Sequence, residues 1–196
     1  GLDLFDPATG KFAHFPPDSE NPAFPQDSLV YALEYDHRGA LWIGYNNGLD
    51  RYENGKFTRY RYDIRNRDGI SSNTVRNIFR DSRDRLWLGT VGGGLMRYDH
   101  DTDRFHHFTK QEGLPNNTVR SILEADDGSL WIGTATGIGI IDREGIFFRG
   151  YSVYNDLKDR DFHTGAWKAA DGYMYFGGQN TLFPLNPNVK LLDRPQ

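Results

Sequence analysis

An acidic turn near the middle of the chain has spacing that resembles part of a metal site. In the stretch DHDTD, Asp99, Asp101 and Asp103 alternate as the first ligands of an EF-hand calcium loop do. Such a loop also needs Gly at its sixth position and Glu at its twelfth, where this chain has Arg104 and Lys110. We therefore interpret the segment as a charged turn between two strands, and we expect no metal and no other cofactor.

Residues suited to catalysis do not form a recognisable set. The chain has no Cys, no Gly-flanked nucleophilic Ser, and no pair of His at metal-ligand spacing beside a carboxylate. The six histidines are His14, His37, His100, His106, His107 and His163. We expect them at surface positions of outer strands, and the sequence predicts no catalytic residue.

Ten residues in Gly-, Asn- and Thr-rich connections are the candidates for contact with a ligand. Amide and hydroxyl groups near an aromatic ring suit sugar hydroxyls, which need neutral donors and acceptors and an apolar ring face. Turns also favour such residues for conformational reasons alone, and both interpretations stay open. The candidates are Tyr45, Asn46, Asn47, Thr90, Asn116, Asn117, Thr134, Thr136, Gln179 and Asn180.

A repeated pattern positions these connections. The motif LWIG or a variant of it occurs four times, with its aromatic residue at Trp42, Trp87, Trp131 and Tyr175, at intervals of 45, 44 and 44 residues. An apolar segment precedes each of the first three motifs, and a second apolar segment and then an aromatic one follow it. About 44 residues thus contain four short strand-like segments between Gly, Asp and Asn turns.

Four short strands per repeat are the content of one blade, so the predicted fold is an all-β propeller of four-stranded antiparallel blades. Helical repeats would need apolar positions at i, i+3, i+4 and i+7 over ten or more residues, whereas these runs are shorter. Since LWIG does not alternate, we expect neighbouring blades on both of its faces and the motif aromatics in the core between them. The Gly that ends the motif is expected to permit the turn into the next strand.

Composition narrows the choice of partners. The 196 residues carry a net charge of −4 with both signs scattered, so we expect no nucleic acid partner. No apolar run approaches the ~20 residues of a membrane span, and no signal peptide opens the chain. A signal or anchor in a longer parent protein is compatible with both observations.

The repeat, with the segment GLPNNTV (113–119) between copies, resembles the two-component regulator propeller repeat from Gly1 to about Pro187. This resemblance implies a periplasmic sensor region of a hybrid histidine kinase in the inner membrane, with the kinase domain elsewhere and no enzymatic activity in this segment. It also implies an oligosaccharide or other polar small-molecule ligand, signalling by altered domain packing, a homodimer through the parent sensor, further propeller blades and a following immunoglobulin-like domain.

The repeat also predicts domain limits, with strands named A to D from the propeller axis outward. We expect a propeller segment over residues 1–187 and an exit linker over 188–196. The expected blades are a partial one at 1–15, full ones at 28–62, 73–109 and 117–151, and a last one at 162–186. Because seven such units need about 310 residues, we interpret the chain as the C-terminal portion of a seven-bladed propeller. A closed four-bladed ring, with strands 1–15 joined to the last blade, is the alternative.

Antiparallel order determines which connections share a face. The D-to-A and B-to-C connections, which carry the ten candidates, should lie on one face, and the A-to-B and C-to-D turns on the other. Two other functions stay open: a non-catalytic scaffold or dimerisation module, and an enzyme similar to the propellers of streptogramin lyases.

Overall fold

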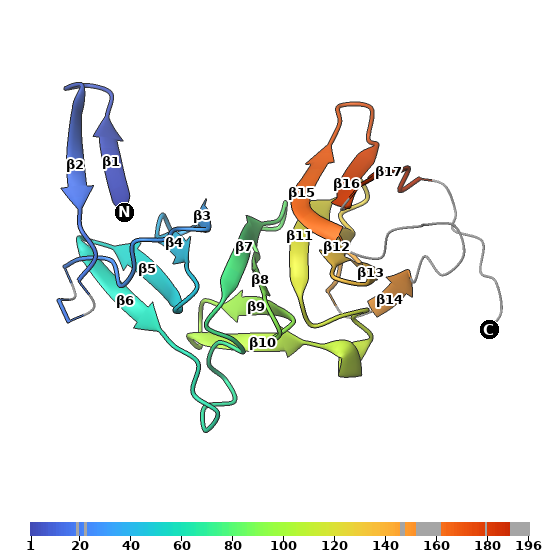
Figure 1. The fold of residues 1–196 in the computed structure, drawn as a ribbon, viewed down its shortest axis with the longest axis horizontal. Helices are drawn as coiled ribbons and strands as arrows, with labels where there is room; N and C mark the ends of the chain where they lie inside the picture. The colour runs from blue at the N-terminus through green and yellow to red at the C-terminus, as the bar shows by residue number, and fades with distance from the viewer. Residues whose placement is uncertain (19, 22, 146–147, 152–161, 179, 189–196) are drawn as a thin grey trace.

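The computed structural model describes residues 1–18, 20–21, 23–145, 148–151, 162–178 and 180–188. The chain forms five antiparallel sheets that follow one another in sequence order (Figure 1). Within each sheet every strand pairs with its neighbour in the sequence. This is the predicted all-β propeller architecture, in which each sheet is one blade.

The strands lie inside the predicted repeat units. A hairpin of β1 (Leu2–Asp6) and β2 (Lys11–Phe15), here called the terminal hairpin, comes first. The first blade contains β3 (Ala32–Tyr35), β4 (Leu41–Gly44), β5 (Leu49–Glu53) and β6 (Lys56–Tyr60). The second contains β7 (Val75–Arg80), β8 (Leu86–Thr90), β9 (Leu95–Asp99) and β10 (Arg104–Phe108). The third contains β11 (Val119–Glu124), β12 (Leu130–Thr134), β13 (Gly137–Ile141) and β14 (Phe148–Tyr151), and the fourth β15 (Phe162–Lys168), β16 (Met174–Gly178) and β17 (Leu182–Leu185).

One short helix lies outside the predicted pattern. The 3-10 helix η1 (Lys110–Glu112) connects β10 to β11. It is held by a capping box, because the Thr109 hydroxyl accepts from the Gln111 backbone and the Glu112 carboxylate accepts from the Thr109 backbone. The sequence T-x-x-E was the signal for it.

Motif tryptophans fill the layers between blades, as predicted. Trp42 of the first blade is fully buried against Leu86, Leu88 and other residues of the second. Trp87 is fully buried in the same way against Ile132 and its neighbours in the third. Leu86 and Leu88 face the first blade and Trp87 faces the third, so both surfaces of β8 are covered. This explains why LWIG does not alternate.

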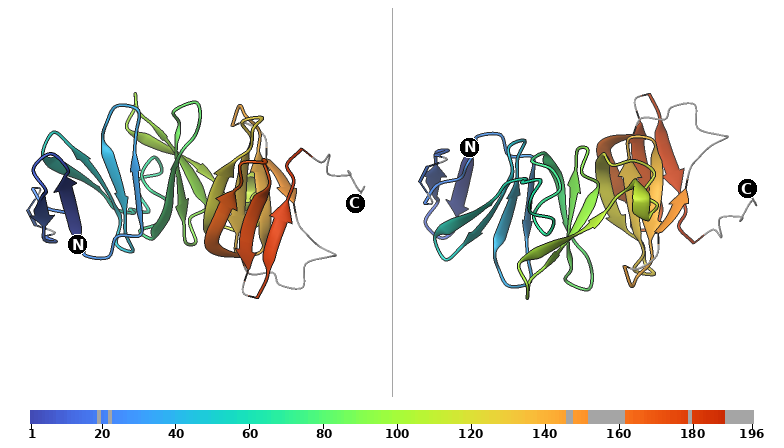
Figure 2. Two further views of the ribbon diagram at one scale, coloured as in Figure 1. Left: turned by 90° about the horizontal axis from the view of Figure 1, so that it is seen from above. Right: turned by 90° about the horizontal axis from the view of Figure 1, so that it is seen from below.

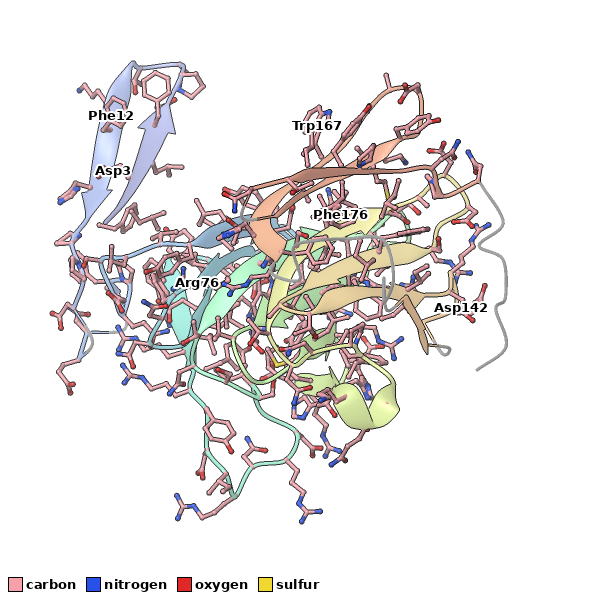
Figure 3. The ribbon with its side chains drawn as sticks, turned by 45° about the vertical axis from the view of Figure 1, so that its right-hand side comes forward. Asp3, Phe12, Arg76, Asp142, Trp167 and Phe176 are labelled. Carbon is pink, nitrogen blue, oxygen red and sulfur yellow. The ribbon has the colours of Figure 1, made fainter. Side chains whose placement is uncertain are left out.

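The last layer differs from the first two. Trp131 packs with Phe176 and its neighbours in the fourth blade, and Phe176 lies between the last two sheets (Figure 3). Tyr175, the fourth motif aromatic, is only half-buried. Trp167 points away from this layer and is 71% exposed. The outer surface of the fourth blade therefore presents aromatic rings that the inner blades bury.

The Gly that ends the first two motifs is required for a different reason from the one expected. Gly44 and Gly89 lie within strands and have no left-handed φ. A Cβ on Gly89 would lie 2.6 Å from Val119 Cγ1, and one on Gly44 would lie 2.8 Å from the Val75 carbonyl oxygen. The next blade approaches too closely for a side chain. Close packing between blades, and not the turn, requires Gly there.

The blades form a row whose A strands adjoin, because β3, β7, β11 and β15 contact one another in turn. The terminal hairpin and the fourth blade lie at opposite ends of this row (Figure 2). Among the described residues β1 pairs only with β2, and β17 only with β16. The arrangement is a partial propeller and not the four-bladed ring considered as the alternative.

Candidate functional site

The predicted face of D-to-A and B-to-C connections exists and is hydrogen-bonded from blade to blade. We call it the loop face; it comprises residues 45–48, 61–74, 91–94, 109–118 and 135–136. The Gly48 amide donates to the Asn73 carbonyl over 2.7 Å, and one repeat later Gly94 donates to Asn117 over 2.7 Å. In the first two blades the B-to-C loop is thus tied to the connection that enters the next blade.

Asn117, a predicted ligand contact, has a structural role shared with Asn73. The Asn117 Oδ1 atom accepts from the Lys110 amide over 2.8 Å, and Asn73 Oδ1 accepts from the Tyr62 amide over 2.7 Å. In both repeats the side chain therefore holds the end of the D strand while its carbonyl holds the B-to-C loop of the preceding blade. The recurrence of Asn at this place follows from these bonds.

Three of the ten predicted contacts are buried. Tyr45, Thr90 and Thr134 have no exposed surface. The Thr90 hydroxyl donates to the Gly94 carbonyl over 2.8 Å and that of Thr134 to the Gly137 carbonyl over 2.7 Å. Both bonds close the B-to-C loop, so these side chains serve the loop itself and do not reach solvent.

The remaining candidates lie closer to solvent. Asn46, Asn47, Thr136 and Asn180 are exposed and Asn116 is half-buried. Asn46 Nδ2 donates to the Tyr31 hydroxyl over 2.9 Å, and the Thr136 hydroxyl donates to the Pro115 carbonyl over 3.3 Å. Gln179 lies outside the described residues. Ligand contact by the accessible side chains stays a prediction.

Two residues missed from the sequence extend the group around Asn46: Tyr31, which contacts it, and Arg76, which contacts Tyr31. Arg76, at the start of β7, places its guanidinium carbon 3.8 Å from the centre of the Tyr31 ring. Figure 3 shows Arg76 where the first two blades meet. Tyr31, Arg76 and Arg120 occupy equivalent positions of their repeats, each directly after a Val. The recurrence of Tyr or Arg at the start of the A strand was the signal available in the sequence.

Comparison with known proteins assigns the repeats. The family described as two component regulator propeller matches residues 69–92 and 113–136. Each matched stretch covers a D-to-A connection, strands A and B and the start of the B-to-C loop. The chain carries two-component regulator propeller repeats. The sequence resemblance is thereby confirmed.

Similarity to solved structures extends over most of the chain. The chain is similar to the extracellular domain of the hybrid two component system BT3049 from B. thetaiotaomicron, with 29% identity, a TM-score of 0.79, and coverage of 96% of this chain and 25% of that one. The extracellular domain of BT4673 from B. thetaiotaomicron has 26% identity and a TM-score of 0.73, with 89% of this chain and 26% of that one covered. The chain thus spans about a quarter of these domains.

A curated relative agrees over a shorter stretch. Histidine kinase P4 of Formosa agariphila is 31% identical over 70 residues, which are 34% of this chain and 5% of that protein. Within the described part of the chain, no helix has the length and hydropathy of a membrane span.

The A-to-B and C-to-D turns form the opposite face of the blades, here called the turn face. There the acidic turn of the second blade, between β9 and β10, places its carboxylates against separate partners. Asp99 accepts from Thr102 over 2.7 Å, Asp101 pairs with Arg38 over 2.7 Å, and Asp103 accepts from Tyr98 over 2.6 Å. Within the described ranges, no three His, Cys, Asp or Glu are grouped as metal ligands. The three carboxylates position the turn, and two of them, Asp101 and Asp103, also border a hollow of about 340 Å³ between the first two blades.

A buried carboxyl in the first blade was also missed from the sequence. Asp50 is fully buried and accepts from the backbone and the side-chain amide of Gln26, each over 2.9 Å. Burial raises its pKa to about 6, against smaller lowering effects that begin with the Gln26 backbone bond. Burial, with the nearby Asp50 charge, also raises the pKa of Tyr45. Equivalent positions hold Met96 and Gly139, so an Asp among apolar residues was the sequence signal.

Proposed function

We propose that this chain is a non-catalytic part of a periplasmic ligand-sensing propeller in a two-component sensor histidine kinase. The observation that carries the proposal is the pair of matched regulator propeller repeats, together with similarity over most of the chain to extracellular domains of hybrid two component systems. In the full reading frame we expect a membrane-spanning helix and a histidine kinase domain beyond residue 196. Their absence would contradict the proposal.

The ligand in this proposal is a glycan or another polar small molecule bound at the loop face. Asn46 and Asn47 are exposed there, the Tyr31 hydroxyl accepts from Asn46, and the Arg76 guanidinium lies against the Tyr31 ring. Neutral amides and a hydroxyl next to an aromatic ring match the hydroxyl groups and apolar faces of sugars. The Tyr31, Asn46 and Arg76 group joins the first blade to the second.

Signal transmission by altered packing follows from the same group. The loop face is already hydrogen-bonded across blades through Gly48 and Asn73. A ligand that contacts two blades can bias their relative packing only by the difference in its affinity for the two arrangements. In the proposed parent protein, further blades, a following immunoglobulin-like domain and a homodimer would receive that change.

Calorimetric titration of this chain with a panel of oligosaccharides tests the ligand proposal. We expect saturable binding of at least one panel member, weakened about tenfold when Asn46→Ala and Asn47→Ala are combined, since each truncation removes hydrogen-bonding groups. Tyr45→Ala is unsuitable because Tyr45 is buried core. Lys56→Ala, exposed beside a C-to-D turn on the opposite face, is the matched control. No binding across the panel would instead support the scaffold alternative.

A further inference from the structure

The terminal hairpin exposes a pair of aromatic rings on the surface that faces away from the first blade. Leu2 and Phe15 pack on the first blade from the other surface of the hairpin. Phe5 and Phe12 are register partners on the outer surface, and they are 49% and 70% exposed. Their ring centroids lie 4.9 Å apart, with an angle of 40° between the ring planes. Contiguous exposed apolar surface is a mark of interaction sites.

The same pair of rings occurs, buried, in the layer between the first two blades. The hairpin sequence GLDLFD aligns with GLMRYD of the second blade, which places Phe5 at the position of Tyr98. With the same offset, Phe12 takes the position of Phe105. The rings of Tyr98 and Phe105 lie 5.1 Å apart with an angle of 46° between their planes. They are only 3% and 4% exposed, because Trp42 of the preceding blade covers them at 4.5 and 6.4 Å between ring centroids. The hairpin thus presents the ring pair that a motif aromatic covers elsewhere.

The outer surface of the fourth blade carries the counterpart of Trp42. Tyr175 is the motif aromatic of this blade, and Trp167 and Pro184 are its register partners on the two neighbouring strands. Since Phe176 packs toward the third blade, this row of three residues faces away from it. Trp167 is 71% exposed, Pro184 is exposed and Tyr175 is half-buried. The fourth blade therefore presents the motif-aromatic side of an interblade layer.

These two surfaces are complementary because they correspond to the two sides of one internal layer. Repeat arrays stay soluble through terminal repeats with a polar outer face, whereas both ends of this array carry aromatic rings. Figure 3 shows Phe12 and Trp167 on the two elements concerned. The hairpin and the fourth blade lie at opposite ends of the row, so the surfaces do not meet within one copy (Figure 2). A second copy brings the matching side to each end.

We propose that the terminal hairpin of one copy of this chain docks on the outer surface of the fourth blade of a second copy. Phe5 and Phe12 of one copy then cover Tyr175 of the other, as the equivalent ring pair of the second blade covers Trp42. The contact is heterologous, so each copy uses two different surfaces and the copies associate head to tail. Since the hairpin supplies two strands only, the contact is smaller than an internal layer and the association is weak. This inference does not rest on a ligand at the loop face.

Analytical ultracentrifugation of the whole chain from about 10 μM to about 1 mM, where small interfaces associate, tests this contact. We expect the weight-average mass to rise from that of one chain to that of two or more. Phe12→Asp blocks the hairpin end, and Pro184→Asp blocks the blade end; each alone should abolish the rise, because every contact needs one intact surface of each kind. Leu182→Asp, which changes a 61% exposed residue on the same surface as Pro184, blocks the blade end independently. The mass of one chain at every concentration would overturn the proposal and leave both surfaces to other blades of a parent propeller.

An equimolar mixture of the two blocked variants distinguishes head-to-tail contact from other association. Phe12→Asp keeps an intact fourth blade and Pro184→Asp keeps an intact hairpin, so the mixture should form dimers that do not grow further. Association of Phe12→Asp on its own would show that fourth blades pair with each other, and it would overturn the proposal. Ile64→Asp, which charges an 80% exposed side chain of the loop face, is the control and should associate as the unchanged protein does. Thermal unfolding of each variant reports whether the blades stay folded.

Discussion

Trp87 donates its indole Nε1–H to Asp81 Oδ2 over 2.8 Å, and both side chains are buried. The other oxygen of Asp81 accepts from the backbone amides of Arg83 and Arg85 over 3.0 and 2.9 Å. A single carboxylate therefore joins the A-to-B turn to the interblade tryptophan. Asp36 repeats every one of these bonds with Trp42 in the first blade.

Removing this carboxylate should destabilise the blade. Asp81→Ala leaves the Trp87 indole and two turn amides without their acceptor, and it frees Arg85, whose Nε donates to Asp81 over 2.6 Å. We expect a loss of about 3 kcal/mol in the free energy of unfolding, measured by urea denaturation. Asp101→Ala, which removes an 86% exposed carboxylate, is the control and should cost under about 1 kcal/mol. Equal losses would contradict the structural role of Asp81.

The third blade lacks this acceptor and offers the reciprocal experiment. Ala125 occupies the position of Asp81, and the buried indole nitrogen of Trp131 has no hydrogen-bond partner among the described residues. Ala125→Asp should raise the free energy of unfolding by about 1 kcal/mol, because the carboxylate satisfies that donor. In a Trp131→Phe background, Ala125→Asp should raise the free energy of unfolding by a smaller amount. A double-mutant cycle with no coupling energy would count against the pairing.

Close approach between blades should make the motif Gly sensitive to a single methyl group. Gly89→Ala places Cβ 2.6 Å from Val119 Cγ1, so we expect a loss of about 1 to 3 kcal/mol in thermal or urea unfolding. Combining it with Val119→Ala should cost less than the sum of the two single changes. Gly165→Ala, at an exposed strand position with no neighbour within 4 Å, should be nearly neutral. Strict additivity would show that the two residues do not conflict.

Asp50 should give the stability a distinct pH dependence. Its pKa is about 6 in the fold and about 3.9 in an unfolded chain. Between these values the folded state holds a proton that the unfolded state has lost, so its contribution to the free energy of unfolding falls as pH rises from about 4 to about 6. Asp50→Asn removes this effect.

Urea denaturation of the unchanged protein and of Asp50→Asn at pH 4, 5, 6 and 7 measures this pH dependence. The stability difference should grow in favour of Asp50→Asn up to pH 6 and then stay constant. Exposed carboxyls with lowered pKa values, such as Asp63, titrate alike in both proteins and cancel in the difference. A difference that does not change from pH 4 to pH 7 would contradict the raised pKa.

The blades could be predicted from the sequence because the residues of their core recur at a fixed spacing along the chain. The spacing of Trp42, Trp87 and Trp131 gave both the repeat length and the residues of the interblade layers. It could not show that the next blade approaches within 2.6 Å of a Cβ on Gly89, since that distance depends on how two sheets pack. The reason assigned to Gly was therefore wrong although its position was right.

The candidate site was less predictable for a related reason. The repeat showed which residues lie in or near the connections, but it did not show where each strand ends. Thr90 and Thr134 are the last residues of their strands, and their side chains are buried. The hollow brings together Arg51 and His100, and the bond from Arg38 to Asp101 that borders it spans 63 residues. Such cross-blade pairs depend on the angle between sheets, which no spacing in the sequence encodes.

The tryptophan layers couple each blade only to its immediate neighbours in the chain. Arrays of this kind behave approximately as one-dimensional systems with nearest-neighbour interactions. Amide hydrogen exchange should therefore be slowest in β8 and β12, which are covered on both sides, and faster in the terminal hairpin, which has one neighbour. A destabilising substitution in one layer should therefore speed exchange in the adjoining blade on each side and have little effect on the blades beyond them.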